Sequence, residues 1–255
     1  MAEKIQIDAG QDQSITALHS APAESLTARI DQTLVIMSHG FPGHKAHQDD
    51  LYGAVEFLLA DRGYHTLRFD YRGCGESDGR EENFTIGSAC EDFQAVLYWA
   101  KSRGYKRFIY VGEGLGATLA IMNMDLDVRA LIMFWPVFDL KSYASRGLNV
   151  KEITDQEQKQ GYVDNNNRRI GLNLINELKK IDIMYALKEV FVPTVIFHGA
   201  RDTLVPISQL DIGRRYIPAK RIEITTFHDG VHGMAQENHR KAMMYQILQF
   251  VEKYI

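Results

Sequence analysis

A glycine-rich turn in the middle of the chain has the spacing of a catalytic motif but lacks its reactive side chain. The turn joins an apolar run at 107–110 to a helical pattern at 115–126. The same strand–turn–helix setting surrounds the Gly-x-Ser-x-Gly motif, whose outer glycines permit a sharp turn and whose serine hydroxyl attacks an acyl carbon. Gly112 and Gly116 fill the outer positions, but Gly114 stands where the serine would be. The sequence thus predicts the backbone of a nucleophile-bearing turn without the nucleophile.

The segments that would position this turn alternate between short apolar runs and longer amphipathic ones. Such alternation predicts an α/β fold with a mostly parallel sheet flanked by helices. Strands are expected at 4–8, 14–19, 33–37, 65–71, 107–110, 128–134, 193–197 and 221–227, the first two as antiparallel edge strands. Helices are expected at 48–62, 86–101, 115–126, 172–180, 208–216 and 236–254.

Residues from about 137 to 190 break this alternation. They are polar and rich in Asn and Lys, and Pro136 ends the strand that precedes them. We interpret them as a cap that passes over the carboxyl edge of the sheet rather than as an independent domain. A chain of 255 residues has the length of one large domain with such an insertion, so a single domain over 1–255 is expected.

Taken in order along the chain, five motifs resemble those of the α/β-hydrolase superfamily. They are His39-Gly40-Phe41-Pro42-Gly43, the segment 70–77, the turn at 112–116, Gly199-Ala200-Arg201-Asp202, and Asp229-Gly230-Val231-His232-Gly233. Each is weak alone, but the resemblance runs nearly end to end. It implies the α/β-hydrolase fold, with a mostly parallel eight-stranded sheet, and a serine hydrolase whose nucleophile, acid and histidine follow one another in the sequence. The position and size of the cap resemble those of small cinnamoyl or feruloyl esterases.

The resemblance places Gly114, Asp202 and His232 at the positions of the nucleophile, the acid and the general base. Such a histidine takes the proton of the nucleophile and returns it to the leaving group, while the acid fixes its tautomer and stabilises its charged form. Simpler interpretations stay open, in which His232 is a surface-loop histidine and Asp202 a turn-forming aspartate. Asp139, just after the preceding strand, is an alternative acid because some superfamily members place theirs there.

The resemblance also assigns the oxyanion hole to the main-chain amides of Phe41 and Leu115. An oxyanion hole needs two donors aimed where negative charge develops on a carbonyl oxygen. Leu115 would be the first residue of a helix, where unpaired amides and the helix dipole favour an anion. Neither role depends on a side chain, so the glycine at position 114 leaves both donors intact. For Phe41, a lining role without an electrostatic task is the simpler alternative.

Gly114 is the one departure from the serine-hydrolase pattern, and three interpretations of it follow. In the first, the chain is a serine ester hydrolase scaffold whose hydrolysis is absent or very slow because the nucleophile is replaced. In the second, it is a natural pseudoenzyme that binds a small acyl or aromatic ligand, or a protein partner. In the third, Gly112-x-Gly114-x-x-Ala117 is a dinucleotide fingerprint. The third is the weakest, since it leaves the motifs around Phe41, Asp202 and His232 unexplained.

Other side chains are candidates for binding rather than chemistry. His39, Tyr143 and Tyr162 are expected to contact a ligand, the tyrosines by stacking on an aromatic acyl group, although packing within the cap is the simpler role for them. His39, His44 and His47 with Asp49 and Asp50 show no recognised metal spacing, and helix capping explains the two aspartates as well. We therefore expect no metal and no cofactor.

Composition limits the classes of partner. The net charge of -4 arises without a block of like charge, so neither nucleic acid nor an anionic membrane is an expected partner. The start of the chain lacks the apolar core of a signal peptide, and Cys74 and Cys90 form no metal or redox spacing. These features predict a cytoplasmic protein, and they give no indication of oligomeric state. The resemblance implies that its partner is a small-molecule ester or a related acyl or aromatic ligand.

Overall fold

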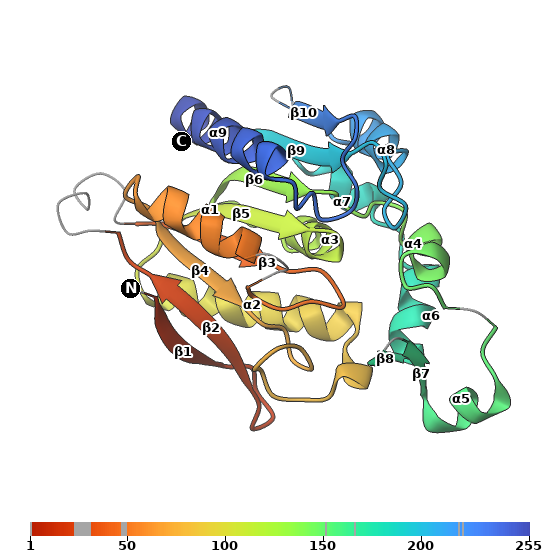
Figure 1. Ribbon diagram of the computed structural model, residues 1–255. Helices are drawn as coiled ribbons and strands as arrows, with labels where there is room; N and C mark the ends of the chain where they lie inside the picture. The colour runs from red at the N-terminus through yellow and green to blue at the C-terminus, as the bar shows by residue number, and fades with distance from the viewer. Residues whose placement is uncertain are drawn as a thin grey trace.

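An eight-stranded sheet with helices on both faces forms the centre of the protein (Figure 1). The computed structural model describes residues 2–22, 32–46, 50–150, 152–165, 167–218, 220 and 222–255. Within these residues the strands lie side by side in the order β1-β2-β4-β3-β5-β6-β9-β10. The prediction of a mostly parallel eight-stranded α/β sheet is therefore confirmed.

The strands agree with the expected segments to within a few residues. They are β1 (Glu3–Asp8), β2 (Ser14–Ser20), β3 (Thr33–Ser38), β4 (His65–Phe69), β5 (Arg107–Glu113), β6 (Val128–Phe134), β9 (Thr194–Gly199) and β10 (Ile222–Phe227). Strand β2 pairs antiparallel with β1 and β4, and the remaining pairs are parallel. All six residues of β3 are buried, because a central parallel strand is covered on both faces and reads as an unbroken apolar run.

Two buried clusters, one on each face of the sheet, hold the layers together. The flanking helices are α1 (Leu51–Ala60), α2 (Ile86–Ser102), α3 (Leu115–Met122), α8 (Gln209–Tyr216) and α9 (Glu237–Tyr254). Helices α1 and α9 pack with one cluster, and α2, α3 and α8 pack with the other. Successive residues of β3 alternate between the clusters, as side chains of a strand must, with Leu34 and Ile36 on one side and Val35 and Met37 on the other.

Helix α3 is shorter than the expected 115–126. It ends at Met122, and the Asn123 side chain donates to the carbonyl of Leu119 at 2.8 Å. Leu126, the last residue of the expected helix, is 97% exposed. Asn123 thus caps α3 about one turn before residue 126, where the helical pattern of the sequence ends. The first residues of the helix expected at 48–62 lie partly outside the described residues.

The segment between β6 and β9 contains more regular structure than expected. It comprises α4 (Leu140–Arg146), α5 (Asp155–Gln160), the hairpin β7 (Tyr162–Asn165) and β8 (Arg168–Gly171), α6 (Leu172–Lys180) and α7 (Met184–Lys188). Contacts with the short helix η3 (Glu81–Asn83) tie this insertion to the core. The Glu81 carboxylate forms an ion pair with Arg168 and accepts a hydrogen bond from the Arg169 amide. The insertion is thereby held against the sheet at a defined place.

A buried ion pair fixes the loops that follow β3 and β4. Asp70 is fully buried, and it accepts from the Lys45 amide and ammonium, both at 2.5 Å, and from the Glu76 amide at 2.8 Å. Breaking such a pair from one side leaves a buried charge without its partner, which is costly. The segment 70–77 therefore shapes the loops below the site.

Candidate active site

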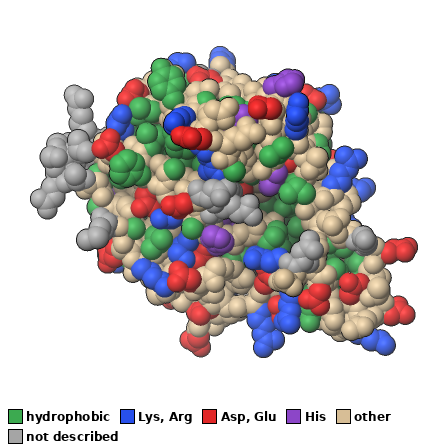
Figure 2. All heavy atoms as spheres, viewed as in Figure 1, with side chains coloured by type: hydrophobic (Ala, Val, Ile, Leu, Met, Phe, Trp, Pro, Cys, Tyr) green, Lys and Arg blue, Asp and Glu red, His purple; other side chains and the backbone are tan. Residues whose placement is uncertain are grey.

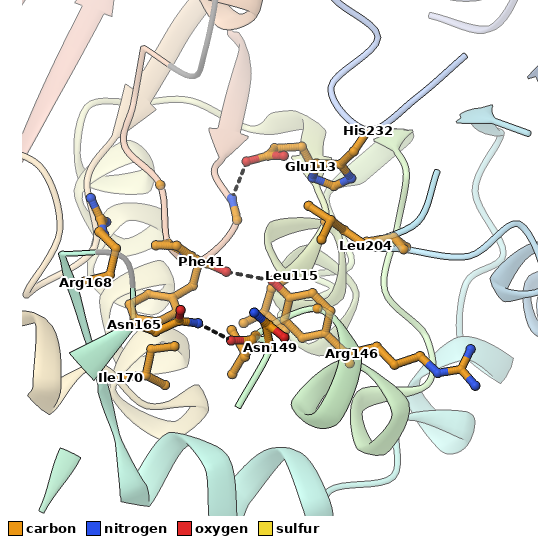
Figure 3. A pocket seen from close by; sticks show the side chains of 18 of the residues that line it. Phe41, Glu113, Leu115, Arg146, Asn149, Asn165, Arg168, Ile170, Leu204 and His232 are labelled. Carbon is orange, nitrogen blue, oxygen red and sulfur yellow. Dashed lines mark hydrogen bonds between the residues drawn. The ribbon is translucent and has the colours of Figure 1, made fainter. Parts of the chain in front are cut away.

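A cavity of about 640 Å³ opens at the carboxyl ends of the central strands, beneath the insertion (Figure 3). Residues 40–44, 113–115, 146–149, 204–205 and 232–233 line it together with Tyr143, Asn165, Arg168 and Ile170. The chain runs from β3 to β4 on one side and later adds β5 on the other, so β3 and β5 flank a switch point in the strand order. Crevices at such points are the usual ligand sites of open α/β sheets.

The turn at residues 112–116 requires glycine at its outer positions but has room at its centre. A Cβ on Gly116 would lie 2.1 Å from the Ser38 carbonyl oxygen, and one on Gly112 would lie 2.5 Å from the Ala117 Cα. At Gly114 the nearest atom to a Cβ is Trp135 Cδ1 at 4.0 Å. The packing is therefore that of a turn built to carry a side chain at position 114.

We expect Gly114→Ala to destabilise the protein even though the space is open. Gly114 has φ 53° and ψ −121°, a conformation that costs a residue with a Cβ on the order of 1–3 kcal/mol. Urea denaturation should show a loss of that size in the free energy of unfolding. Gly116→Ala is the matched comparison and should cost more, because its Cβ meets main-chain atoms that cannot move away. Equal stability of Gly114→Ala and the unmodified protein would contradict the strained geometry.

His232 and Asp202 form a hydrogen-bonded pair at the cavity wall. His232 Nδ1 lies 2.8 Å from Asp202 Oδ2, and the other carboxylate oxygen accepts from the amides of Leu204 and Val205 at 2.9 and 2.8 Å. The Asp202 side chain is 1% exposed, whereas that of His232 is 33% exposed and lines the cavity. A carboxylate fixed by two amides holds the proton on Nδ1 and leaves Nε2 as the acceptor, which is the tautomer of a general base.

Asp139, the alternative acid, has a different task. Its Oδ1 accepts from the Ser142 amide at 2.9 Å, so it caps the first turn of α4. Its own amide and that of Phe138 donate to Gln209 Oε1, both at 2.7 Å. It is Asp202, and not Asp139, that lies beside the His232 imidazole.

The loop after β3 and the start of α3 bring Phe41 and Leu115 to the same cavity. Among the described residues, neither amide donates a hydrogen bond within the protein. The Phe41 carbonyl accepts from the Tyr143 hydroxyl at 2.7 Å, and the Phe41 ring stacks on Phe84 with centroids 4.3 Å apart. These contacts from two sides fix the loop, so its amide direction is set before any ligand arrives.

Glu113 and Trp135 belong to the floor of the site, although neither was a candidate site residue from the sequence. Glu113 is 7% exposed and lines the cavity. Its Oε1 accepts from the Gly40 amide at 2.7 Å (Figure 3). Its Oε2 accepts from Trp135 Nε1 at 2.9 Å. The Trp135 ring also lies 5.7 Å from the His232 ring, centroid to centroid. One signal in the sequence is an acidic residue that ends an otherwise apolar strand.

Of the three residues expected to contact a ligand, only Tyr143 lines the cavity. His39 is fully buried below the loop, with Nδ1 2.6 Å from the Gly40 carbonyl oxygen and Nε2 accepting from the Tyr71 amide at 3.2 Å. Burial lowers its pKa, so it is a neutral structural histidine. Tyr162 lies in β7 below the guanidinium of Arg169, 5.0 Å from the ring centroid.

The polar residues between positions 39 and 50 that were considered for a metal site lie only partly within the described part of the chain. His47 and Asp49 lie outside the described residues. Asp50 precedes α1 but makes no capping hydrogen bond, and it pairs with Arg68 at 3.2 Å instead. Among the described residues, no group of three or more His, Cys, Asp or Glu could hold a metal ion. In the same residues, no helix is both long and apolar enough to cross a membrane.

The place of the Gly112 turn in the sheet bears on the dinucleotide interpretation, and the surface bears on the expected distribution of charge. The turn at Gly112 follows β5, the third parallel strand in chain order, whereas the dinucleotide fingerprint occupies the first βα turn of its sheet, so that interpretation lacks its structural context. On the face seen in Figure 2, acidic and basic side chains are interspersed over the surface outside the grey atoms.

Comparisons with known proteins give one family and several similar structures. The alpha/beta hydrolase fold family matches residues 33–123, which span β3 to α3. AB hydrolase superfamily protein YisY of Bacillus subtilis is 27% identical over 244 residues, covering 81% of this chain and 87% of that protein. Est1E from Butyrivibrio proteoclasticus, solved with ferulic acid bound, has a TM-score of 0.83 at 23% identity, covering 98% of each chain. Mouse alpha/beta hydrolase domain-containing protein 10 has a TM-score of 0.76 at 20% identity, covering 99% of each chain.

Proposed function

The chain belongs to the α/β-hydrolase superfamily, and we propose that it carries the site of a carboxylic-ester hydrolase in which Gly114 occupies the nucleophile position. The observation that carries this proposal is the His232–Asp202 pair at 2.8 Å, which faces the same cavity as Gly114. The amides of Phe41 and Leu115 at that cavity supply the donors that an oxyanion requires. Esterase is the activity best matched by these parts, and the similar structures support it.

Without a hydroxyl at position 114, no acyl-enzyme can form. Direct hydrolysis then requires a water near the vacated hydroxyl position. His232 Nε2 takes one proton from that water, and the hydroxide adds to the ester carbon while the carbonyl oxygen becomes an oxyanion at the two amides. Collapse breaks the carbon–oxygen bond to the alcohol, which receives the proton from His232. Positioning and the oxyanion hole leave roughly 10³–10⁴ over water in comparable sites, so hydrolysis is expected to be very slow or absent.

Substitution of Gly114 by serine tests the proposal directly, since it supplies the one missing group at a position with room for it. Turnover of a short p-nitrophenyl ester or a hydroxycinnamate ester is expected to appear. A well-folded Gly114→Ser protein without turnover on either ester would overturn the proposal.

The intact cavity favours a second candidate function, the binding of a small acyl or aromatic ligand without turnover. Tyr143 supplies an aromatic wall, and the loop that carries Phe41 is fixed from both sides. The unmodified protein is expected to bind hydroxycinnamate esters with micromolar dissociation constants. At a ligand concentration 100 times the dissociation constant, the protein should gain about 2.7 kcal/mol of stability, which a thermal-shift assay detects. A flat profile across a broad panel of acyl and aromatic compounds would count against ligand binding.

A further inference from the structure

His198 is a fully buried histidine of β9 that the proposed reaction does not use. Its Nε2 lies 2.8 Å from the carbonyl oxygen of Val205. Since a carbonyl oxygen only accepts, the ring proton is on Nε2 and Nδ1 carries a lone pair. Nδ1 is buried and forms no hydrogen bond within the described part of the chain. The polar contact of the ring is therefore with the loop that follows Asp202.

His198 donates this hydrogen bond as a neutral imidazole. Burial is the main cause that lowers its pKa, and the hydrogen bond to Val205 and the charge of Asp202 oppose this only in part. Protonated His232 would lower the pKa of His198 further. A neutral His198 adds no charge beside Asp202, so it does not compete with His232 for the carboxylate.

The half of the loop before Asp202 is held by main-chain hydrogen bonds. The amide of Ala200 donates to the Phe227 carbonyl, and the amide of Arg201 donates to the Gly230 carbonyl, both at 2.8 Å. Both acceptors belong to β10 or to the loop that carries the general base. This half is therefore fixed whatever side chain stands at position 198.

The half of the loop after Asp202 is closed on itself. The amides of Leu204 and Val205 donate to the Asp202 carboxylate, and Leu204 lies beside His232 in the cavity wall (Figure 3). For residues 203–205, the hydrogen bond from His198 is the one that reaches a strand of the sheet among the described residues. Val205 thus accepts from β9 at its carbonyl and donates to the acid at its amide.

We propose that His198 is the positioning residue of the acid, and that it holds the Asp202 carboxylate against the His232 imidazole through the main chain of Val205. A residue whose carbonyl is fixed has little freedom at its amide, so the carboxylate oxygen that accepts from this amide is fixed as well. A displacement of about 1 Å in a catalytic group costs up to about 10² in rate. The inference rests on the proposed function, because it takes His232 to be the general base.

The first measurement uses the unmodified protein and needs no turnover. A proton shared between His232 Nδ1 and a buried carboxylate is deshielded, so proton NMR should show it as a separate low-field resonance, assigned by its loss in His232→Ala. His198→Leu removes the donor to Val205 and should broaden or remove this resonance through faster exchange with water. His198→Gln keeps an N–H that can reach the same carbonyl and should retain the resonance.

The second measurement repeats these changes in the Gly114→Ser protein. His198→Leu should lower kcat for a p-nitrophenyl ester by about 10- to 10²-fold and leave KM nearly unchanged, since the acid does not touch the substrate. His198→Gln should recover most of kcat. A merely structural role would lower the stability of His198→Leu without this division between kcat and KM.

Two further variants keep the result interpretable. Ile196→Val alters a buried side chain two residues earlier in β9, removes no polar group, and should keep both the resonance and kcat while lowering stability. His198→Met replaces His198→Leu if leucine does not fold, because methionine adapts to irregular spaces. Retention of the resonance or of kcat in the folded apolar variant would overturn the role of His198, as would equal losses in Ile196→Val. A Gly114→Ser protein without turnover would overturn the proposed function instead, and the resonance would still decide whether His198 positions the acid.

Discussion

Gly114→Ser is expected to raise the turnover of a p-nitrophenyl acyl ester by at least about 10³-fold over the unmodified protein. In comparable sites, loss of the serine costs on the order of 10⁶ in kcat, because the covalent route is closed. The restored hydroxyl would enter a cavity that already holds the His232–Asp202 pair, and the nearest atom to its Cβ is 4.0 Å away. Initial-rate and pre-steady-state measurements check the expected gain, and a burst should precede turnover.

Gly114→Ala is the control for this result. It introduces the same Cβ and the same backbone strain at φ 53° but carries no hydroxyl. Its turnover should remain at the level of the unmodified protein. If Gly114→Ala gained as much activity as Gly114→Ser, the gain would come from a change in the turn rather than from a nucleophile.

Removal of the imidazole from the Gly114→Ser protein is expected to abolish nearly all of the activity gained. His232 is the histidine hydrogen-bonded to Asp202 at the cavity, so His232→Ala leaves the new hydroxyl without a base. Asp202→Asn in the same background should lower kcat by about 10⁴, because the imidazole loses the tautomer with a free Nε2. Combining the two changes should cost little more than His232→Ala alone, since residues that act as a unit are not additive.

Asp139→Asn is the matched control for the acid. Asp139 caps α4, and asparagine caps a helix about as well, so stability and turnover should hardly change. Comparable losses in Asp139→Asn and Asp202→Asn would contradict the assignment of Asp202. Retention of most activity in His232→Ala would contradict the general-base role.

The fold could be predicted largely because local patterns and tertiary structure agree in this chain. Buried parallel strands such as β3 and β6 are mostly apolar runs, interrupted in β6 by the exposed Arg129, and their bounds were close to those predicted. The hairpin of β7 and β8 was missed because its strands have four residues each and are polar, so no alternation marks them. The end of α3 was missed because capping by Asn123 overrides the apolar pattern.

The site could be predicted only where its parts follow from motif spacing. The turn around Gly114 and the loops of Asp202 and His232 have such spacing, and the structure brings all three to one cavity or its wall. Glu113 has no motif of its own, because its role depends on a contact with Gly40, 73 positions away in the sequence.

His39 illustrates the opposite error. Its place in a motif suggested a ligand contact, but both ring nitrogens are used by the backbone below the loop, at 2.6 and 3.2 Å. The sequence alone does not say to which side of a buried strand end a side chain turns. That choice is made by packing, here by the edge-to-face contact with Tyr71 at 5.0 Å between ring centroids.

The central claim is that this cavity is an ester-hydrolase site from which only the nucleophile is absent. Intact-mass spectrometry of the Gly114→Ser protein, quenched shortly after mixing with a p-nitrophenyl ester, tests it most directly. The account predicts one acyl group per chain, located by peptide mapping to the introduced serine, and none in Gly114→Ala. A folded Gly114→Ser protein that acquires no acyl group, or acquires it at another residue, would contradict the claim.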